Sequence, residues 1–287
     1  MFKVIKSQIK IIIFKALSLF FKTRVGNYII EKMLHLSLNN FKEINYNDCK
    51  LKFIVPNRIN RFRVDTFATK EPETLEWINS FKKNSIFWDI GANVGLFSCY
   101  ASKNLNCKVI AFEPSIFNLE LLGRNIFINQ LVDKITVIPI PLTDNLSENK
   151  LNISTTEWGG SGSTFGQNYT YDGSILNTKF DYKTIGISMD QAVNLLKIPQ
   201  PDYIKIDVDG IEHLILKGGE KTLQSVKSIL VEIDDKFKKQ KENTEKYLNN
   251  AGFRLKEKKH SKLFDNTQYE SCFNQVWEKK EQTIKNI

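Results

Sequence analysis

A carboxylate, two glycines and a second carboxylate follow one another at a spacing that suits a nucleotide site. Asp89 ends an apolar run, Gly91 and Gly95 follow four residues apart, and Glu113 ends a second apolar run. Glycines let the backbone turn tightly beside a ligand, and the N–H groups at the start of the next helix can bind an anion. Glu113 is placed to accept hydrogen bonds from a ribose diol. The pattern predicts a nucleotide site on a doubly wound sheet.

The charge pattern favours S-adenosylmethionine over a dinucleotide. A dinucleotide fingerprint needs a third glycine, whereas this loop has the pattern Gly-x-x-x-Gly. Asp89 would repel a pyrophosphate but attract the ammonium and sulfonium groups of S-adenosylmethionine. An NAD-linked oxidoreductase is the disfavoured alternative. The residues that we expect to bind the cofactor here are Asp89, Gly91, Ala92, Asn93, Gly95 and Glu113.

Several separated segments resemble one protein family. The chain is similar to the FkbM-type S-adenosylmethionine-dependent methyltransferases over about residues 60–235, at 71–78 (EPETLEWI), 88–100 (WDIGANVGLFSCY), 111–115 (AFEPS), 125–129 (NIFIN) and 203–212 (YIKIDVDGIE). The resemblance is specific because these motifs agree in order and spacing. It implies a class I methyltransferase fold and methyl transfer, commonly to a hydroxyl oxygen of a sugar or natural product. It does not supply the substrate.

The resemblance also implies further cofactor contacts. Asp144, which follows the third expected strand, would meet the adenine amino group. Glu71 and Thr74 would contact the methionine end of the cofactor. For Thr74 a second interpretation stays open, because it or a neighbour could simply cap the helix that starts there.

Charged residues in an apolar strand indicate where an acceptor would bind. Lys205, Asp207 and Asp209 fall on one face of an expected strand by the two-residue period. Buried charges are unfavourable unless they are paired or ligated, so this face should border a polar site. Glu232 and Asp234 share a face of the following strand. In a class I methyltransferase sheet these strand ends lie beside the glycine turn, where ligands bind.

Three roles stay open for these carboxylates. Asp207, Asp209 and Glu232 could face the acceptor and hydrogen-bond its hydroxyl and the cofactor ammonium. Asp207, Glu232 and Asp234 could instead hold a divalent cation such as Mg²⁺, which prefers oxygen ligands. A structural ion-pair cluster around Lys205 is the third interpretation.

His213 is a candidate general base just beyond the same motif. Asp207 and Glu212 compete with it for that role, and an ordinary surface or capping histidine is the alternative. Alignment of the nucleophile with the methyl group can contribute about 7–11 kcal/mol, whereas a base typically adds about 10²–10⁴-fold. We therefore expect replacement of His213 only to slow the reaction.

The composition is that of a globular protein with a basic balance. Hydrophobic residues make up 41% of the 287 residues and charged residues 25%, and the formal net charge is +9. The lysines gather near both ends without an RNA-binding motif, which favours a solvated surface over nucleic-acid binding. Attraction to an anionic membrane face or an acidic glycan stays open. Four cysteines without C-x-x-C spacing indicate reduced core thiols and a cytoplasmic location.

The chain divides into three expected regions. Residues 1–38 form a basic amphipathic helical segment, 39–81 form short strands and a helix, and 82–287 form the cofactor-binding domain. The N-terminal apolar run is too short and too interrupted by Lys15 to span a membrane. Two interpretations stay open for residues 1–22: docking onto the protein itself or a partner, or peripheral contact with the inner membrane face.

Apolar periodicity predicts a doubly wound fold with a mostly parallel sheet covered on both faces. The expected strands are 85–90, 108–113, 135–140, 202–208 and 228–233, with an antiparallel edge near 253–257 and 272–278. The expected helices are 71–81, 94–103, 116–130, 189–196, one from 211, and 238–250. A polar insertion at about 142–184 should be a functional loop.

These patterns predict an S-adenosylmethionine-dependent O-methyltransferase that acts on a hydroxyl of a saccharide or glycan precursor. Trp158, Tyr169 and Tyr171 in the insertion could stack on sugar faces or only pack the loop. The alternatives are methylation of a lipid, natural product or protein, and, less favoured, a non-catalytic module that binds a glycan or membrane.

Overall fold

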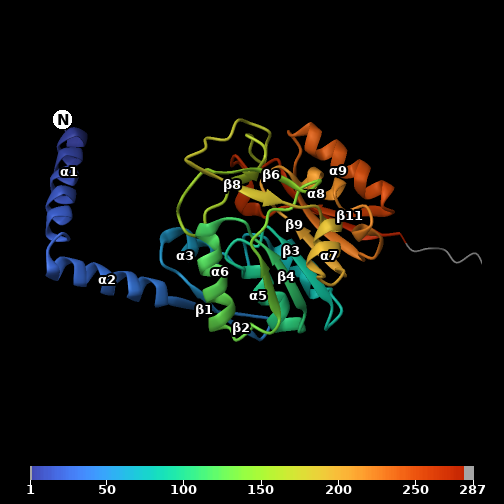
Figure 1. The fold of residues 1–287 in the computed structure, drawn as a ribbon, viewed down its shortest axis with the longest axis horizontal. Helices are drawn as coiled ribbons and strands as arrows, with labels where there is room; N and C mark the ends of the chain where they lie inside the picture. Colours follow the sequence, from blue (N-terminus) through green and yellow to red (C-terminus); the bar gives the residue numbers. More distant parts are fainter. Residues whose placement is uncertain (1, 281–287) are drawn as a thin grey trace, which may run out of the picture.

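A seven-stranded sheet forms the centre of the chain, which a computed structural model describes over residues 2–280, leaving aside the side chains of residues 2–7, 9 and 10. Its strands are β3 (Ile86–Ile90), β4 (Lys108–Phe112), β5 (Ile135–Ile138), β9 (Tyr203–Ile206), β10 (Ser228–Asp234), β11 (Phe253–Lys259) and β12 (Cys272–Lys279). They lie in the order β11-β12-β10-β9-β3-β4-β5 (Figure 1). Strands β10 to β5 of this order are parallel, whereas β12 is antiparallel to both neighbours. The predicted doubly wound sheet with an antiparallel C-terminal edge is confirmed.

Helices cover both faces of the sheet because its strands are apolar on both sides. The helices are α4 (Pro72–Asn79), α5 (Leu96–Leu105), α6 (Ile116–Ile128), α7 (Met189–Leu196), α8 (Glu212–Lys217) and α9 (Lys238–Asn250), with short 3₁₀ turns η1 (Thr222–Gln224) and η2 (Lys262–Phe264). Phe87 of β3 packs in one core with α4, α5 and α6. Trp88 and Ile90 pack in the opposite core with α7, α8 and α9. Alternate side chains of one strand therefore hold the two helical layers together.

A hairpin of β1 (Phe41–Tyr46) and β2 (Cys49–Ile54) precedes the sheet and is attached to α6 by two asparagines. Asn129 accepts a hydrogen bond from the Lys52 N–H group (2.9 Å) and donates to the Lys52 carbonyl (2.7 Å). Asn125 accepts from the Ile54 N–H group (2.8 Å) and donates to the Val94 carbonyl (2.8 Å). The side-chain amides of Asn125 and Asn129 lie one helical turn apart. They bond the backbone groups of β2 that a neighbouring strand would otherwise bond.

The expectation of short strands throughout residues 39–65 was wrong at its end, where a helix forms. This helix is α3 (Arg58–Asp65). Asn57 caps it, because its side chain accepts a hydrogen bond from the Asn60 N–H group at 2.9 Å. The cap residue directly follows Pro56, so the extended segment stops there.

The insertion at 142–184 is a small sheet with loops rather than a loop alone. Its strands are β6 (Ser147–Ile153), β7 (Ser163–Phe165) and β8 (Phe180–Gly186), in the order β7-β6-β8. Leu151, Ile153 and Phe165 are buried in the core shared with the central sheet. These scattered apolar side chains anchor an otherwise polar segment over the carboxyl ends of the central strands.

Two N-terminal helices form an arm that extends from the α/β body (Figure 1). They are α1 (Phe2–Phe20) and α2 (Arg24–Asn39), which confirms the predicted helical segment. The lysine side chains of the predicted basic face before residue 11 lie outside the described ones. Among the described helices, none has the length and apolar character needed to cross a membrane.

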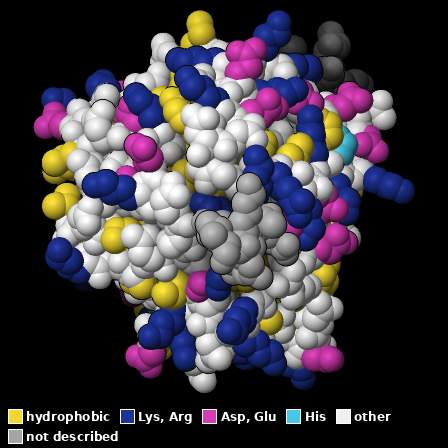
Figure 2. Space-filling view, turned by 90° about the vertical axis from the view of Figure 1, so that its right-hand side faces the viewer, with side chains coloured by type: hydrophobic (Ala, Val, Ile, Leu, Met, Phe, Trp, Pro, Cys, Tyr) yellow, Lys and Arg dark blue, Asp and Glu magenta, His cyan; other side chains and the backbone are white. Residues whose placement is uncertain are grey.

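The four cysteines are buried and unbridged, as the sequence predicted. On the face seen in Figure 2, lysines and arginines are interspersed with acidic side chains rather than collected in one patch. That distribution is typical of a solvated surface.

We predict that Asn125→Leu lowers the free energy of unfolding by about 1–3 kcal/mol, because the buried Ile54 N–H group loses its acceptor. Urea unfolding measures the change. Asn249→Leu, at an exposed position of α9, is the control and should stay within about 0.5 kcal/mol of the parent. Equal stabilities for the two variants would contradict the anchoring role.

Candidate functional site

The glycine turn after β3 is built so that only glycine fits at its first position. Gly91 has φ +84°, and a Cβ there would lie 1.9 Å from the Asp207 carbonyl oxygen. The Gly91 and Ala92 N–H groups both donate to the Phe112 carbonyl, at 2.9 and 3.0 Å. The turn is thus pressed between the ends of β9 and β4. Gly95 instead allows close approach of Leu122 on α6.

Glu113, which directly follows β4, is held by one backbone N–H group of the glycine turn and by another just after β4. One carboxylate oxygen accepts from the Asn93 N–H group and the other from the Ser115 N–H group, both at 2.8 Å. Burial raises the pKa of Glu113 to about 7, against the opposing effect of these two hydrogen bonds. Each oxygen keeps a lone pair for a ligand hydroxyl group.

A cleft of about 1080 Å³ opens beside this turn, at the carboxyl ends of the parallel strands. Ligands of doubly wound sheets bind at such a place, where the strand order reverses between β3 and β9. The volume lies slightly above the usual range of small-molecule sites, about 300–1,000 Å³. The predicted site residues that line it are Glu71, Gly91, Ala92, Asn93, Glu113, Asp207, Asp209 and Glu232.

Lys205 and two carboxyl groups form the charged side of the cleft. Lys205 is 1% exposed, and its ammonium lies 2.6 Å from Asp207 Oδ2. Burial alone would raise the pKa of Asp207, but the Lys205 cation holds it below its usual range. Burial and the Asp207 charge raise the pKa of Glu232 well above its usual range. Two carboxyl groups whose pKa values are shifted in opposite directions therefore face the same space.

Glu71 and Asp209 complete the acidic lining but are already bonded. Glu71 forms an ion pair with Lys70 at 2.5 Å. Asp209 accepts a hydrogen bond from the Gly162 N–H group at 2.7 Å, and burial raises its pKa. Asp209 therefore holds the insertion as well as lining the cleft.

The Gly-rich part of the insertion, residues 158–162, lies across the glycine turn as a strap. Asn118 accepts from the Gly159 N–H group (3.0 Å) and donates to the Gly160 carbonyl (3.1 Å). The Asn93 side chain also donates to Gly160 (2.8 Å), and Arg63 Nε donates to the Gly159 carbonyl (2.9 Å). Bonds from three separate elements thus fix the strap at the cleft.

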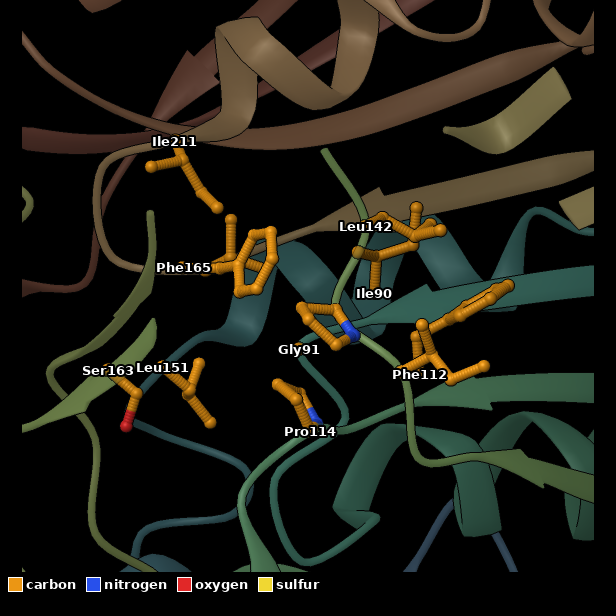
Figure 3. A pocket seen from close by; sticks show the side chains of 12 residues that line it. Ile90, Gly91, Phe112, Pro114, Leu142, Leu151, Ser163, Phe165 and Ile211 are labelled. Carbon is orange, nitrogen blue, oxygen red and sulfur yellow. The ribbon is translucent and has the colours of Figure 1, made fainter. Parts of the chain in front are cut away.

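A narrow apolar pocket continues from the cleft. In Figure 3, Phe165, Ile211 and Leu151 approach it from one side and Phe112 and Leu142 from the other. Gly91, Pro114, Ser163 and Val208 line both the pocket and the cleft. The pocket's volume of about 30 Å³ is room for one or two water molecules.

The structure leaves several predicted residues outside the cleft. Asp89 is buried behind it and accepts a hydrogen bond from Ser98 Oγ at 2.5 Å. Asp144 forms an ion pair with Lys217 at 2.8 Å instead of lining the apolar pocket. Thr74 is buried in α4 and is not its N-cap, since that position belongs to Glu71.

His213 is also outside the cleft, in the first turn of α8. It is 2% exposed and packs edge-on against Phe237. Burial lowers its pKa to about 4, so the ring is neutral at pH 7. The position gives no support to the predicted role as general base.

The predicted cation ligands do not converge. Asp234 is buried, accepts from the Lys236 N–H group (2.7 Å) and from Ser271 Oγ (2.9 Å), and does not line the cleft with Asp207 and Glu232. Over residues 2–280, no three His, Cys, Asp or Glu side chains are grouped to hold a metal ion.

Aromatic side chains at the mouth of the cleft were only partly predicted. Tyr171 and Tyr269 are paired at 5.1 Å between ring centroids, and Phe264 lies 5.8 Å from Tyr269. All three line the cleft, whereas Trp158 and Tyr169 pack elsewhere. Phe264 and Tyr269 come from the segment between β11 and β12, which no sequence motif marked.

Comparison with known proteins identifies the family of the chain. Residues 89–255 match the family described as "Methyltransferase FkbM domain". The chain is 32% identical over 152 residues to the hexuronic acid methyltransferase AglP of Haloferax volcanii, covering 53% of this chain and 57% of that protein. It is 24% identical over 177 residues to the methyltransferase sdnD of Sordaria araneosa, covering 54% of this chain and 68% of that one.

A solved methyltransferase FkbM from Methylobacillus flagellatus KT has a TM-score of 0.47 and 15% identity to the chain, covering 77% of this chain and 52% of that one. The chain spans 57% of the length of the hexuronic acid methyltransferase AglP. The family match covers the glycine turn, Glu113, the strap and the strand ends that carry Asp207 and Glu232. Because the match extends over more than half of its residues, the chain belongs to the FkbM methyltransferase family.

Proposed function

We propose that the chain transfers a methyl group from S-adenosylmethionine to a hydroxyl oxygen of a saccharide or glycan precursor. The observation that carries this proposal is the content of the cleft: Glu113, fixed by two backbone N–H groups, shares it with the Asp207 and Glu232 carboxyl groups. Glu113 could accept hydrogen bonds from the ribose of a nucleoside, and Asp207 and Glu232 could accept or donate a proton. Family membership supports methyl transfer as the reaction.

Different residues of the cleft suit different parts of S-adenosylmethionine. Glu113 would accept hydrogen bonds from the ribose hydroxyl groups, and the part of the cleft lined by Pro114 would take the adenine ring. Glu71 and Asp207 would attract the ammonium group. Asp89 would act from behind the site, by fixing Ser98 at the start of α5. When bound, S-adenosylmethionine supplies a methyl group on a positively charged sulfur, which an oxygen nucleophile can attack.

Asp207 and Glu232 would take up the proton of the acceptor hydroxyl group as a pair. Lys205 keeps Asp207 ionised, and burial gives Glu232 a high affinity for a proton. S-adenosylmethionine would supply the methyl group and leave as a neutral thioether, while the proton of the acceptor hydroxyl group would pass to the ionised carboxylate of this pair. The pair would add a modest factor to what alignment supplies.

The mouth of the cleft supports a saccharide as acceptor. Tyr171, Phe264 and Tyr269 offer aromatic faces against which the C–H face of a sugar ring can pack. Arg63 adds a cation from α3, which would suit an acidic sugar. The relative from Haloferax volcanii is by its name a hexuronic acid methyltransferase, which supports the same class of acceptor.

We predict that Glu113→Gln weakens S-adenosylmethionine binding by about 10- to 100-fold, because hydrogen bonds to a charged group contribute about 1.5–3 kcal/mol. Calorimetry measures the dissociation constant, and Glu120→Gln on the exposed side of α6 is the control. With a pKa of about 7, Glu113 is protonated at lower pH, and ribose hydroxyl groups donate more strongly to the ionised form. Affinity of the parent should therefore rise with pH between about 5.5 and 7.5. A parallel pH profile in Glu113→Gln would refute the ribose assignment.

Asp207→Asn and Glu232→Gln should each lower kcat by about 10²–10⁴-fold while binding of S-adenosylmethionine changes little for Glu232→Gln. His213→Gln should retain kcat within about threefold, because the ring does not line the cleft. A methyl-transfer assay with labelled cofactor on candidate saccharides gives kcat. A loss of kcat in His213→Gln as large as that in Glu232→Gln would support His213 as the general base.

Tyr269→Ala should raise KM for the acceptor about 2- to 15-fold, since an aromatic contact is worth about 0.5–1.5 kcal/mol. The cofactor dissociation constant should not change. Phe180→Ala on β8 is a matched control, because the two side chains are 39% and 38% exposed and Phe180 lies outside the cleft. If the two variants had the same KM for the acceptor, the aromatic side chains at the mouth of the cleft would not belong to the acceptor site.

A further inference from the structure

The N-terminal arm exposes large apolar side chains on most of its surface. Four consecutive residues of α1, at 11–14, are exposed, and Phe14 is 74% exposed. Because successive residues of a helix point about 100° apart, these four side chains face almost every direction around it. On α2, Val25, Met33 and Leu36 are likewise exposed. An apolar surface of this extent marks an interaction site.

The rest of the described chain does not cover this surface. The arm meets the body only near the end of α2, where Ser37 Oγ donates to the Pro56 carbonyl at 3.1 Å and Leu38 packs beside Ile54. Figure 1 shows α1 at the far end of the arm, away from the sheet and its helices. Docking of α1 onto its own body, one of the two interpretations from the sequence, is therefore not what the structure adopts.

The charge of residues 1–22 indicates which kind of partner would cover the apolar side chains of the arm. Residues 1–22 contain five lysines and no acidic residue. In a symmetric contact between two copies, these like charges would face each other and repel. An anionic lipid surface attracts them, at about 1 kcal/mol per lysine near the surface. Long lysine side chains can also extend to the headgroups while the apolar part of the helix sinks between them.

The corner between the two helices fixes their relative direction. Thr23 Oγ1 accepts a hydrogen bond from the Gly26 N–H group (3.0 Å) and donates to the Phe20 carbonyl (2.8 Å). At Gly26 a Cβ would lie 2.1 Å from that same carbonyl oxygen, so the close approach needs glycine. The corner lets α1 lie along a surface while α2 leads away from it to the catalytic body.

We propose that α1 and the first turns of α2 bind the surface of an anionic lipid bilayer, as a peripheral anchor for the body. This proposal is independent of the methyl-transfer function, because none of the cleft residues belongs to the arm. It would keep the cleft close to acceptors that are themselves held at a membrane.

Cosedimentation of the full chain with vesicles tests the anchor. The vesicles are phosphatidylcholine alone or phosphatidylcholine mixed with phosphatidylglycerol, and the variants are Phe14→Glu and Phe127→Glu. The two phenylalanines are 74% and 75% exposed, but Phe127 is on α6 of the body. Phe14→Glu should lower partition into the mixed vesicles by about tenfold or more. Phe127→Glu should bind like the parent.

A second pair of measurements separates the competing occupants. Lys15→Gln with Lys22→Gln should weaken binding to the mixed vesicles and reduce its dependence on salt. Cofactor binding by calorimetry should be unchanged in Phe14→Glu, which shows that the body is folded. No binding of the parent to mixed vesicles would overturn the proposal. So would a dimer in light scattering that Phe14→Glu dissociates, because the arm would then join two copies of the chain.

Discussion

The ion pair between Lys205 and Asp207 is the interaction on which the site depends. Lys205 is buried at the end of β9, and its cation is attracted to Asp207, Glu71 and Asp89, which come from three separate segments. Although burial alone would lower the pKa of this ammonium, these carboxylates raise it. An unpaired carboxylate in such a place would take up a proton. One central cation therefore permits acidic groups to be concentrated beside a cofactor that is itself positively charged.

The site is assembled from segments far apart in the sequence because the strand order reverses next to β3. The glycine turn follows β3, Glu113 follows β4, and Asp207 follows β9 on the other side of β3. The strap from the insertion then spans the gap, bonded to Asn93, Asn118 and Asp209. The charged side chains of the cleft are thus placed by strand ends, whereas its aromatic mouth is built from loops.

Local patterns were enough to predict the central sheet and several of the side chains that line the cleft. Apolar runs located its strands, and the two-residue period correctly put Lys205 and Asp207 at a polar edge. Sequence proximity failed for His213, because the first turn of α8 directs that side chain into the protein against Phe237. The insertion was misjudged as a loop because its strands are mostly polar, and a few apolar anchors such as Phe165 decide its fold. Tyr269 could not be predicted, since only tertiary packing brings it to the cleft.

The two asparagines of α6 have a consequence for solubility. Strand β2 pairs with β1 along one side, and Asn125 and Asn129 occupy backbone groups of Lys52 and Ile54 on its other side. Unsatisfied strand edges are templates on which foreign strands can add. Here that edge of β2 is closed by side chains instead of by a further strand, so foreign strands cannot add to the ribbon on this side.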